Sequence, residues 1–154
     1  MQLAADLMAV LVERGETVCT AESLTGGLLC AYLTAAPGAS QSVRGGVVAY
    51  MTDVKRDVVG VDPDLLRSHG AVSAPTAVAL ARNASRLFLA DWAIATTGVA
   101  GPTEQEGKPV GTVFVAIAGA HTEAVVDLRL TGDRVRIREQ ACAAGIALLH
   151  KILE

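Results

Sequence analysis

The sequence predicts an α/β protein, a three-layer α/β/α domain with a mixed, mostly parallel sheet. Helical patterns alternate with short buried strand patterns over the first two-thirds of the chain, which is typical of parallel strands joined by helices. Two strand patterns separated by a hairpin-length connection follow, and they add antiparallel strands. The chain has 154 residues, of which 51% are hydrophobic, so we expect residues 1–154 to form a single domain.

The first helix and the first strand are predicted close to the start of the chain. Apolar residues recur at helical spacing between Leu3 and Leu11, which predicts a helix over residues 1–14. Gly15 follows directly and is a typical helix stop. Residues 17–21 then form a short run of strand length, which predicts a buried strand.

A helix, a strand and a short helix are predicted next. Residues 28–35 continue with helical spacing, and the Pro37-Gly38 pair closes this helix. Residues 44–51 are rich in valine and glycine and read as the second strand. A short helix over residues 53–59 ends at Gly60.

Two further helices have recognisable start signals. Asp62 is the expected N-cap of a short helix whose first residue is Pro63 and which stops at Gly70. A longer helix is predicted over residues 75–89, preceded by Ser73 or Ala74 as the cap. Its apolar residues fall on one face and its arginines on the other, so it should lie on the sheet.

The last third of the chain supplies three strands and a helix. Residues 92–97 form a buried strand, and the Gly- and Pro-containing segment 98–109 is a loop. Residues 110–118 and 123–130 are strands joined as a hairpin. A final helix runs over residues 133–153.

Charge and composition argue against several classes of function. The net charge is −3, and the 13 Lys and Arg residues are scattered instead of forming the basic stripe that nucleic-acid binding requires. Aromatic residues make up only 3% of the chain, which argues against base-stacking platforms. We therefore expect no nucleic acid as a partner, and a small molecule as the ligand.

Metal, cofactor and membrane binding are not expected either. Cys19, Cys30 and Cys142 form no C-x-x-C pair, and the histidines are too widely spaced for a metal-ligand motif. No apolar run approaches the roughly 20 residues of a membrane span, and the start lacks a signal-peptide pattern. We expect a cytoplasmic protein without metal or cofactor. A homo-oligomer is compatible with this, since Leu65 and Leu66 could form an exposed dimer contact.

Three strand-end loops have a composition that suits a binding site. They read AESLTGG, AYMTDVK and TTGVAGPTEQEGKPVGT. In open α/β sheets, ligands bind beyond the carboxyl ends of the strands, where loops lead into helices. We therefore expect the three loops to meet at one site.

Ser23, in the first of these loops, has two interpretations. The local pattern favours an N-cap role, because serine commonly caps a helix and Gly26-Gly27 would permit close packing. Ser23 could instead be a nucleophile beside backbone N–H groups that stabilise negative charge. The sequence contains no G-x-S-x-G elbow, so an α/β-hydrolase arrangement is not indicated.

Lys55 is the candidate base for such a serine. A buried lysine can lose its proton because desolvation lowers its pKa, and it can then accept the proton of a serine. Tyr50 ends a strand and Lys55 follows five residues later, so both can face the strand ends that carry Ser23. Each residue alone is more commonly structural, and only the combination with Ser23 suggests chemistry.

Five ordered segments together resemble the CinA C-terminal domain family, the nicotinamide-nucleotide amidohydrolases of bacterial pyridine-nucleotide salvage. They read AESLTGGLL, GGVVAYMTDVKRDVVGV, GAVSAPTAVALA, TTGVAGPTEQEGKPVGTVFVAIA and TGDRVRIREQA, and they cover nearly the whole chain. The resemblance implies deamidation of nicotinamide mononucleotide to nicotinic acid mononucleotide and ammonia, without a metal.

The resemblance also implies roles for individual residues. Ser23 falls on the nucleophile, Lys55 on its base and Tyr50 on a residue that assists them. Arg138 falls on an arginine of the last helix near the active site, and the substrate-binding residues would be Thr25, Gly26, Gly27, Thr97, Gly98, Ala100, Gly101 and Arg138.

The chain departs from the family pattern at two places. Leu24 stands where many members carry cysteine, and a core-facing apolar side chain should replace it with little effect. The loop from Thr103 to Glu106 is less rich in glycine than usual, and its acids Glu104 and Glu106 could repel a phosphorylated substrate. A non-catalytic nucleotide-binding or regulatory module, and a purely structural role for the motifs, remain the alternatives.

Overall fold

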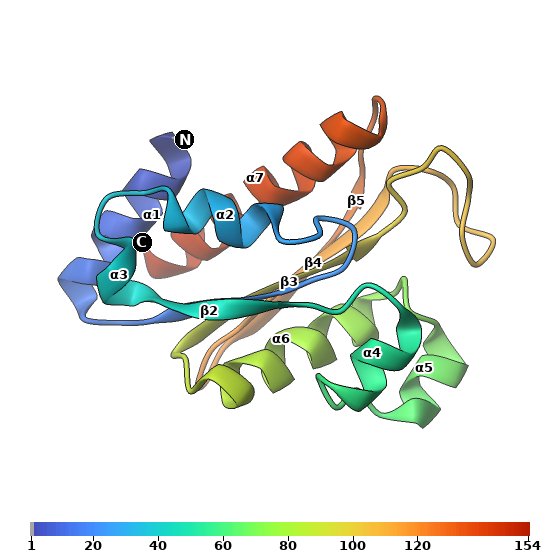
Figure 1. Ribbon diagram of the computed structural model, residues 1–154, viewed down its shortest axis with the longest axis horizontal. Helices are drawn as coiled ribbons and strands as arrows, with labels where there is room; N and C mark the ends of the chain where they lie inside the picture. Colours follow the sequence, from blue (N-terminus) through green and yellow to red (C-terminus); the bar gives the residue numbers. More distant parts are fainter. Residues whose placement is uncertain (1) are drawn as a thin grey trace.

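The computed structural model describes residues 2–154 and contains one five-stranded sheet between two layers of helices (Figure 1). The strand order is β2-β1-β3-β4-β5. β1 (Val18–Glu22) lies between β2 (Val43–Val48) and β3 (Trp92–Gly98) and is parallel to both. β4 (Thr112–Ala118) is antiparallel to β3 and to β5 (Glu123–Arg129), so only β4 runs against the other strands described. The predicted mixed, mostly parallel sheet is confirmed.

The helices cover both faces of the sheet, which confirms the three predicted layers (Figure 1). On one face lie α1 (Gln2–Arg14), α2 (Leu28–Thr34), the short α3 (Ala39–Ser42) and α7 (Arg134–Leu153). On the other lie α4 (Thr52–Asp57), α5 (Pro63–His69) and α6 (Ala74–Phe88). None of these helices combines the length and the apolar character that a membrane crossing requires.

Two apolar cores hold the layers together. Ile94 of β3 belongs to the core beneath α1, α2 and α7, whereas its neighbours Ala93 and Ala95 belong to the core beneath α6. This division follows from the alternation of side chains along a strand. β1 and β4 are buried along their whole length, whereas the edge strands β2 and β5 alternate between half-buried and exposed residues.

The predicted helix and strand boundaries agree with the structure to within a few residues, and two predicted caps are present. The Asp62 carboxylate accepts a hydrogen bond from the Asp64 N–H at 2.8 Å, and the Ser73 hydroxyl accepts one from the Thr76 N–H at 3.3 Å. The four-residue α3 was not predicted, because it is too short to show a helical repeat.

Leu65 and Leu66 do not form the exposed pair that the sequence suggested. Both side chains are half-buried and pack against the core beneath α6. The exposed large apolar residues include Tyr50, Met51 and Val58, which follow β2 and flank α4. Other exposed large apolar residues, such as Leu87, Leu89 and Val135, lie on α6, just after it and on α7, and none of the exposed large apolar residues is on α5 among the described residues.

Register places the carboxyl ends of the three parallel strands side by side. Glu22, the last residue of β1, is opposite Val48 of β2 and Thr96 of β3. The segments that follow these strands therefore start at one edge of the sheet, as expected for an α/β site. Ser23 and Tyr50 belong to two of these segments.

Candidate active site

A cavity of about 670 Å³ lies at this edge of the sheet. All three predicted loops contribute to its lining, together with the segment before α6 and the first residue of α7. The lining residues are Ser23, Leu24, Tyr50, Met51, Thr52, Asp53, Lys55, Ala71, Val72, Thr97, Gly98, Val99, Ala100, Gly101, Thr103, Glu104, Gln105 and Arg134.

Ser23 lies in the turn between β1 and α2, and its side chain faces Lys55. Its N–H donates to the Thr96 carbonyl at 3.0 Å, and its own carbonyl accepts from the Gly26 N–H at 3.0 Å. The residue is only 8% exposed. Ser23 is not the N-cap of α2, because that position belongs to Gly27, which has a φ of 97° and no side chain to cap with. The local expectation of a capping serine was therefore wrong.

The capping role belongs to Glu22, a residue that the sequence analysis did not single out. Its carboxylate accepts the N–H groups of Gly27 at 2.9 Å, Leu29 at 3.0 Å and Cys30 at 2.8 Å. The Thr20 hydroxyl donates a fourth hydrogen bond at 3.0 Å. Glu22 is 1% exposed, so these four donors compensate for the loss of water around its charge. The Glu22 carboxylate thus links the residue before Ser23 to the first residues of α2.

Lys55, on α4, is buried with an exposure of 1%, and its amine has three partners. Nζ lies 2.9 Å from Ser23 Oγ, 2.7 Å from the Ala49 carbonyl oxygen and 3.0 Å from the Tyr50 carbonyl oxygen. Burial lowers the pKa of Lys55 to about 8, while the negative charge of Glu106 acts in the opposite direction. An appreciable fraction of Lys55 is therefore neutral near physiological pH.

The three partners suit a lysine that exchanges a proton with a serine. A neutral amine has two N–H groups, which the carbonyls of Ala49 and Tyr50 can accept, and one lone pair, which is then directed at Ser23. The ammonium form donates to all three oxygens. Both protonation states therefore keep their hydrogen bonds, so a proton can move between Ser23 and Lys55 without rearrangement.

Tyr50 contributes its main chain to the pair, while its ring lies elsewhere. Its carbonyl accepts from Lys55, but the side chain is 54% exposed and its hydroxyl accepts a hydrogen bond from Arg134 at 2.7 Å. Arg134 also donates to the Gly101 carbonyl at 2.6 Å. Together, Tyr50 and Arg134 join two walls of the cavity at its rim. Arg134 was not among the binding residues predicted from the sequence, although it lines the cavity.

Arg138 does not line the cavity. Its guanidinium donates to the Leu24 and Thr25 carbonyls, at 2.9 Å each, and thereby supports the Ser23 turn from behind. Thr25, Gly26 and Gly27 are likewise absent from the lining residues, and the Thr25 hydroxyl is buried against the Thr96 hydroxyl at 2.7 Å. In the structure these four residues make contacts within the turn, and their expected role in substrate binding stays a prediction.

The other predicted binding residues do line the cavity. Thr97 and Gly98 at the end of β3, with Ala100 and Gly101 just after it, form one wall of the cavity. Within residues 2–154, the N–H groups of Leu24 and Ala100 have no hydrogen-bond acceptor, and both residues lie at the cavity. Free backbone N–H groups beside a nucleophile can stabilise an oxyanion.

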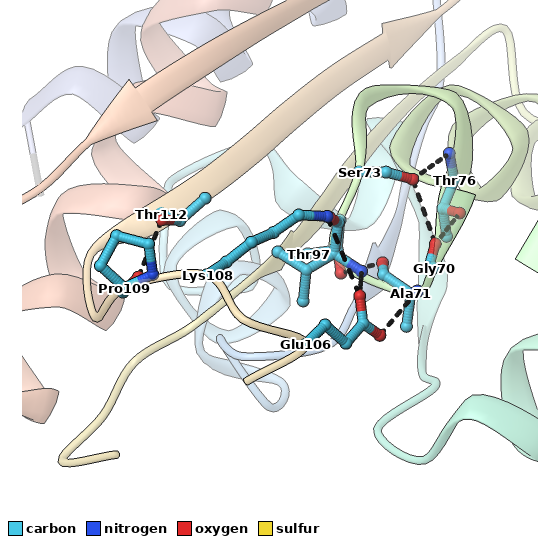
Figure 2. Close-up of polar contacts among 10 residues, drawn as sticks. Gly70, Ala71, Ser73, Thr76, Thr97, Glu106, Lys108, Pro109 and Thr112 are labelled. Atoms are coloured by element: carbon cyan, nitrogen blue, oxygen red, sulfur yellow. Dashed lines mark hydrogen bonds and ion pairs between the residues drawn. The ribbon is translucent and has the colours of Figure 1, made fainter. Parts of the chain in front are cut away.

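The unusual loop places its two acids in different surroundings. Glu104 lines the cavity, as the concern about a phosphorylated substrate supposed. Glu106 does not, because its carboxylate turns to the N–H groups of Ala71 and Val72 (Figure 2). Leu24, at the other departure from the family pattern, is 3% exposed and packs in the core beneath α7.

Fold and site together define a class, a three-layer α/β domain with a buried serine–lysine pair at the carboxyl ends of its parallel strands. The model of the CinA C-terminal domain matches residues 1–153. The chain therefore belongs to the CinA C-terminal domain family.

Relatives of known sequence support this assignment. A CinA-like protein from Frankia casuarinae is 46% identical over 147 residues, which are 96% of this chain and 34% of that protein. A CinA-like protein from Anaeromyxobacter is 48% identical over 153 residues, or 99% of this chain and 37% of that protein. The chain thus spans about a third of the length of these curated relatives.

Solved structures have the same fold over nearly the whole chain. The competence-damaged protein (CinA) superfamily protein from Klebsiella pneumoniae is 35% identical, with a TM-score of 0.96, and the match covers 99% of this chain and 96% of that one. A competence/damage inducible protein from Agrobacterium tumefaciens is also 35% identical, with a TM-score of 0.95, covering 99% and 94%.

Proposed function

We propose that this domain is a metal-independent amide hydrolase that converts nicotinamide mononucleotide to nicotinic acid mononucleotide and ammonia in pyridine-nucleotide salvage. The observation that carries the proposal is the 2.9 Å contact between Lys55 Nζ and Ser23 Oγ, inside a cavity and shielded from water. The nucleotide substrate comes from the family resemblance of the sequence motifs, and membership of the family supports it.

In the proposed reaction, Ser23 attacks the carboxamide carbon while Lys55 takes its proton. Neutral Lys55 becomes an ammonium that still has the Ala49 and Tyr50 carbonyls as hydrogen-bond partners, and these partners offset part of the cost of a buried charge. The N–H groups of Leu24 and Ala100 are candidates to hold the oxyanion. Lys55 then returns the proton to the departing nitrogen, which leaves as ammonia. Water, activated by the same lysine, hydrolyses the acyl-enzyme and frees Ser23.

The charges around the cavity indicate where the phosphate would bind. The N-terminus of α2, a conventional anion site, is already occupied by the Glu22 carboxylate. Arg134 is exposed at the rim, and no other arginine is among the described residues that line the cavity. Asp53 and Glu104 also line the cavity, so the phosphate should lie toward Arg134 and away from them.

An ammonia-release assay with nicotinamide mononucleotide tests the proposal. Ser23→Ala and Lys55→Ala should each abolish release, whereas Lys151→Ala, which removes an exposed lysine far along α7, should not. Circular dichroism checks that each variant is folded. Full activity in either site variant would refute the serine–lysine mechanism. Calorimetric binding of the mononucleotide with no ammonia formed would instead favour the non-catalytic binding module.

A further inference from the structure

The loop between β3 and β4 contains a tight turn that has no role in the reaction proposed above. Gln105 and Lys108 form an isolated β-bridge, with hydrogen bonds of 3.2 and 2.8 Å between their main chains. The two residues between them, Glu106 and Gly107, have φ values of 54° and 70°. Glycine adopts this left-handed conformation readily, whereas a glutamate does so rarely. Glu106 is therefore held in a backbone conformation that its own residue type disfavours.

The contacts of the Glu106 carboxylate account for its orientation. One oxygen accepts the Ala71 N–H at 2.9 Å and the other accepts the Val72 N–H at 3.1 Å (Figure 2). Lys108 donates to the Val72 carbonyl and lies 3.9 Å from the same carboxylate. A side chain on Gly70 would collide with this carboxylate, so the glycine leaves room for it. The loop thus binds two consecutive residues of the segment before α6, Ala71 and Val72.

The segment that Glu106 and Lys108 contact, Ala71–Val72, is a wall of the proposed active site. Ala71 and Val72 line the cavity, and the Ala71 carbonyl accepts a hydrogen bond from the Thr97 hydroxyl at 2.7 Å (Figure 2). Thr97 lines the cavity from β3. Ala71 is therefore tied to Glu106 through its N–H and to Thr97 through its carbonyl. A change at Glu106 should reach the cavity through this residue, although Glu106 itself does not line it.

The charge of Glu106 also acts on the proposed base. The charged and titratable groups around Lys55 include Tyr50 on the loop after β2, Asp53 on α4, Glu104 on the β3–β4 loop and Arg134 on α7. Glu22, at the end of β1, is committed to the N-terminus of α2. The negative charge of Glu106 raises the pKa of Lys55, against the larger effect of burial, which lowers it.

We propose that Glu106 is a positioning residue for the amide hydrolysis, because its carboxylate fixes the Ala71–Val72 wall of the cavity that Thr97 also holds. This inference rests on the proposed function. Glu106 reaches the reaction through Ala71 by hydrogen bonds and through Lys55 by its charge. Glu106 is thus a support of the site and not a repulsive group within it.

Direct titration of Lys55 provides a test that does not depend on turnover. The lysines of the chain are Lys55, Lys108 and Lys151, so labelling the lysine ε-carbons gives three NMR signals to follow against pH. In Glu106→Gln, the midpoint of Lys55 should fall by a few tenths of a pH unit, because the amide carries no charge. Glu13→Gln removes an exposed charge from α1 and should leave that midpoint unchanged.

A second variant separates position from charge. Glu106→Asp keeps the charge but shortens the side chain, so the Lys55 midpoint should stay close to that of the original chain. Exchange of the Ala71 and Val72 amide hydrogens should become faster in both variants, because their acceptors are weakened. An unchanged Lys55 midpoint in Glu106→Gln, or unchanged exchange at both amides, would overturn the proposal.

The kinetic measurement then links the contact to the reaction. The acid limb of kcat/KM for nicotinamide mononucleotide should move to lower pH in Glu106→Gln, in step with the NMR midpoint, and kcat should fall more than KM changes. A profile identical to that of Glu13→Gln would overturn the role in catalysis. If the unmodified protein releases no ammonia, the proposed function fails, while the titration still decides whether Glu106 acts on Lys55.

Discussion

Lys55 Nζ lies 2.9 Å from Ser23 Oγ, although 32 residues separate the two in the chain. The contact depends on the parallel pairing of β1 and β2, which brings the end of each strand to the same edge of the sheet. α4 then returns Lys55 to that edge, where the main chain of the preceding loop receives its amine. The fold therefore brings Ser23 and Lys55 together, and burial lowers the pKa of Lys55.

The rate of the proposed reaction should rise with pH. Burial lowers the pKa of Lys55 to about 8, and only the neutral amine can accept the Ser23 proton. We expect kcat/KM for nicotinamide mononucleotide to increase tenfold per pH unit below about 8 and to level off above it. Lys55→Arg should be inactive at every pH tested, since arginine stays protonated. An acid limb near the pKa of an ordinary exposed lysine would contradict this assignment.

The stability of the fold should depend on pH through the same residue. The pKa of Lys55 is about 8 in the folded protein, whereas an ordinary exposed lysine has a pKa of 10.5, so between these values the unfolded chain binds more protons. Stability therefore rises with pH across this window, by about 3 kcal/mol in total. Below pH 8 both states are protonated, and the contribution of Lys55 no longer changes.

Urea unfolding of the original chain and of Lys55→Met, measured from pH 7 to 11, isolates this effect. Methionine also deprives the Ala49 and Tyr50 carbonyls of a donor, but that loss does not vary with pH. The difference in unfolding free energy between the two proteins should therefore grow in favour of the original chain as pH rises. A difference that stays constant over the range would show that Lys55 is not an ammonium held in a low-dielectric site.

The architecture could be predicted from the sequence because the patterns that indicate helices and strands are local. Alternating strand and helix patterns, with caps such as Asp62 and Ser73, were sufficient to predict the layers. The convergence of Ser23 with Lys55 also followed, from the rule that parallel strands end at one edge.

The direction in which a side chain points could not be predicted from such local patterns. Arg134 and Arg138 lie one turn apart on α7, yet the first extends from the helix start toward Tyr50 and the second meets the turn after β1. Glu22 reaches donors as far away as Cys30, which no periodicity reveals. A usable signal was present, because a helix that starts at Gly27 has no capping side chain of its own and needs one from elsewhere.

Replacing Glu22 should destabilise the fold strongly. Glu22→Gln keeps the shape but directs an amide NH₂ toward backbone N–H groups that now share a single acceptor oxygen. We expect a loss of roughly 2–4 kcal/mol in the free energy of unfolding, because buried donors lose charged partners. Chemical denaturation beside Glu13→Gln, an exposed glutamate on α1, provides the comparison. Equal stability of the two variants would mean that the Glu22 carboxylate is not required at the start of α2.

Arg134 should distinguish the nucleotide from its nucleoside. If its guanidinium binds the phosphate, Arg134→Ala should raise KM for nicotinamide mononucleotide by roughly 10- to 100-fold, the value of one charge-assisted hydrogen bond. KM for nicotinamide riboside, which lacks the phosphate, should change little. Arg136→Ala removes an exposed arginine two residues further along α7 and serves as the matched control. Because Arg134 also holds the Tyr50 hydroxyl and the Gly101 carbonyl, Tyr50→Phe is needed to separate loss of this rim contact from loss of the positive charge. Equal losses for nucleotide and nucleoside in Arg134→Ala would place the phosphate elsewhere and leave Arg134 as a support of the rim.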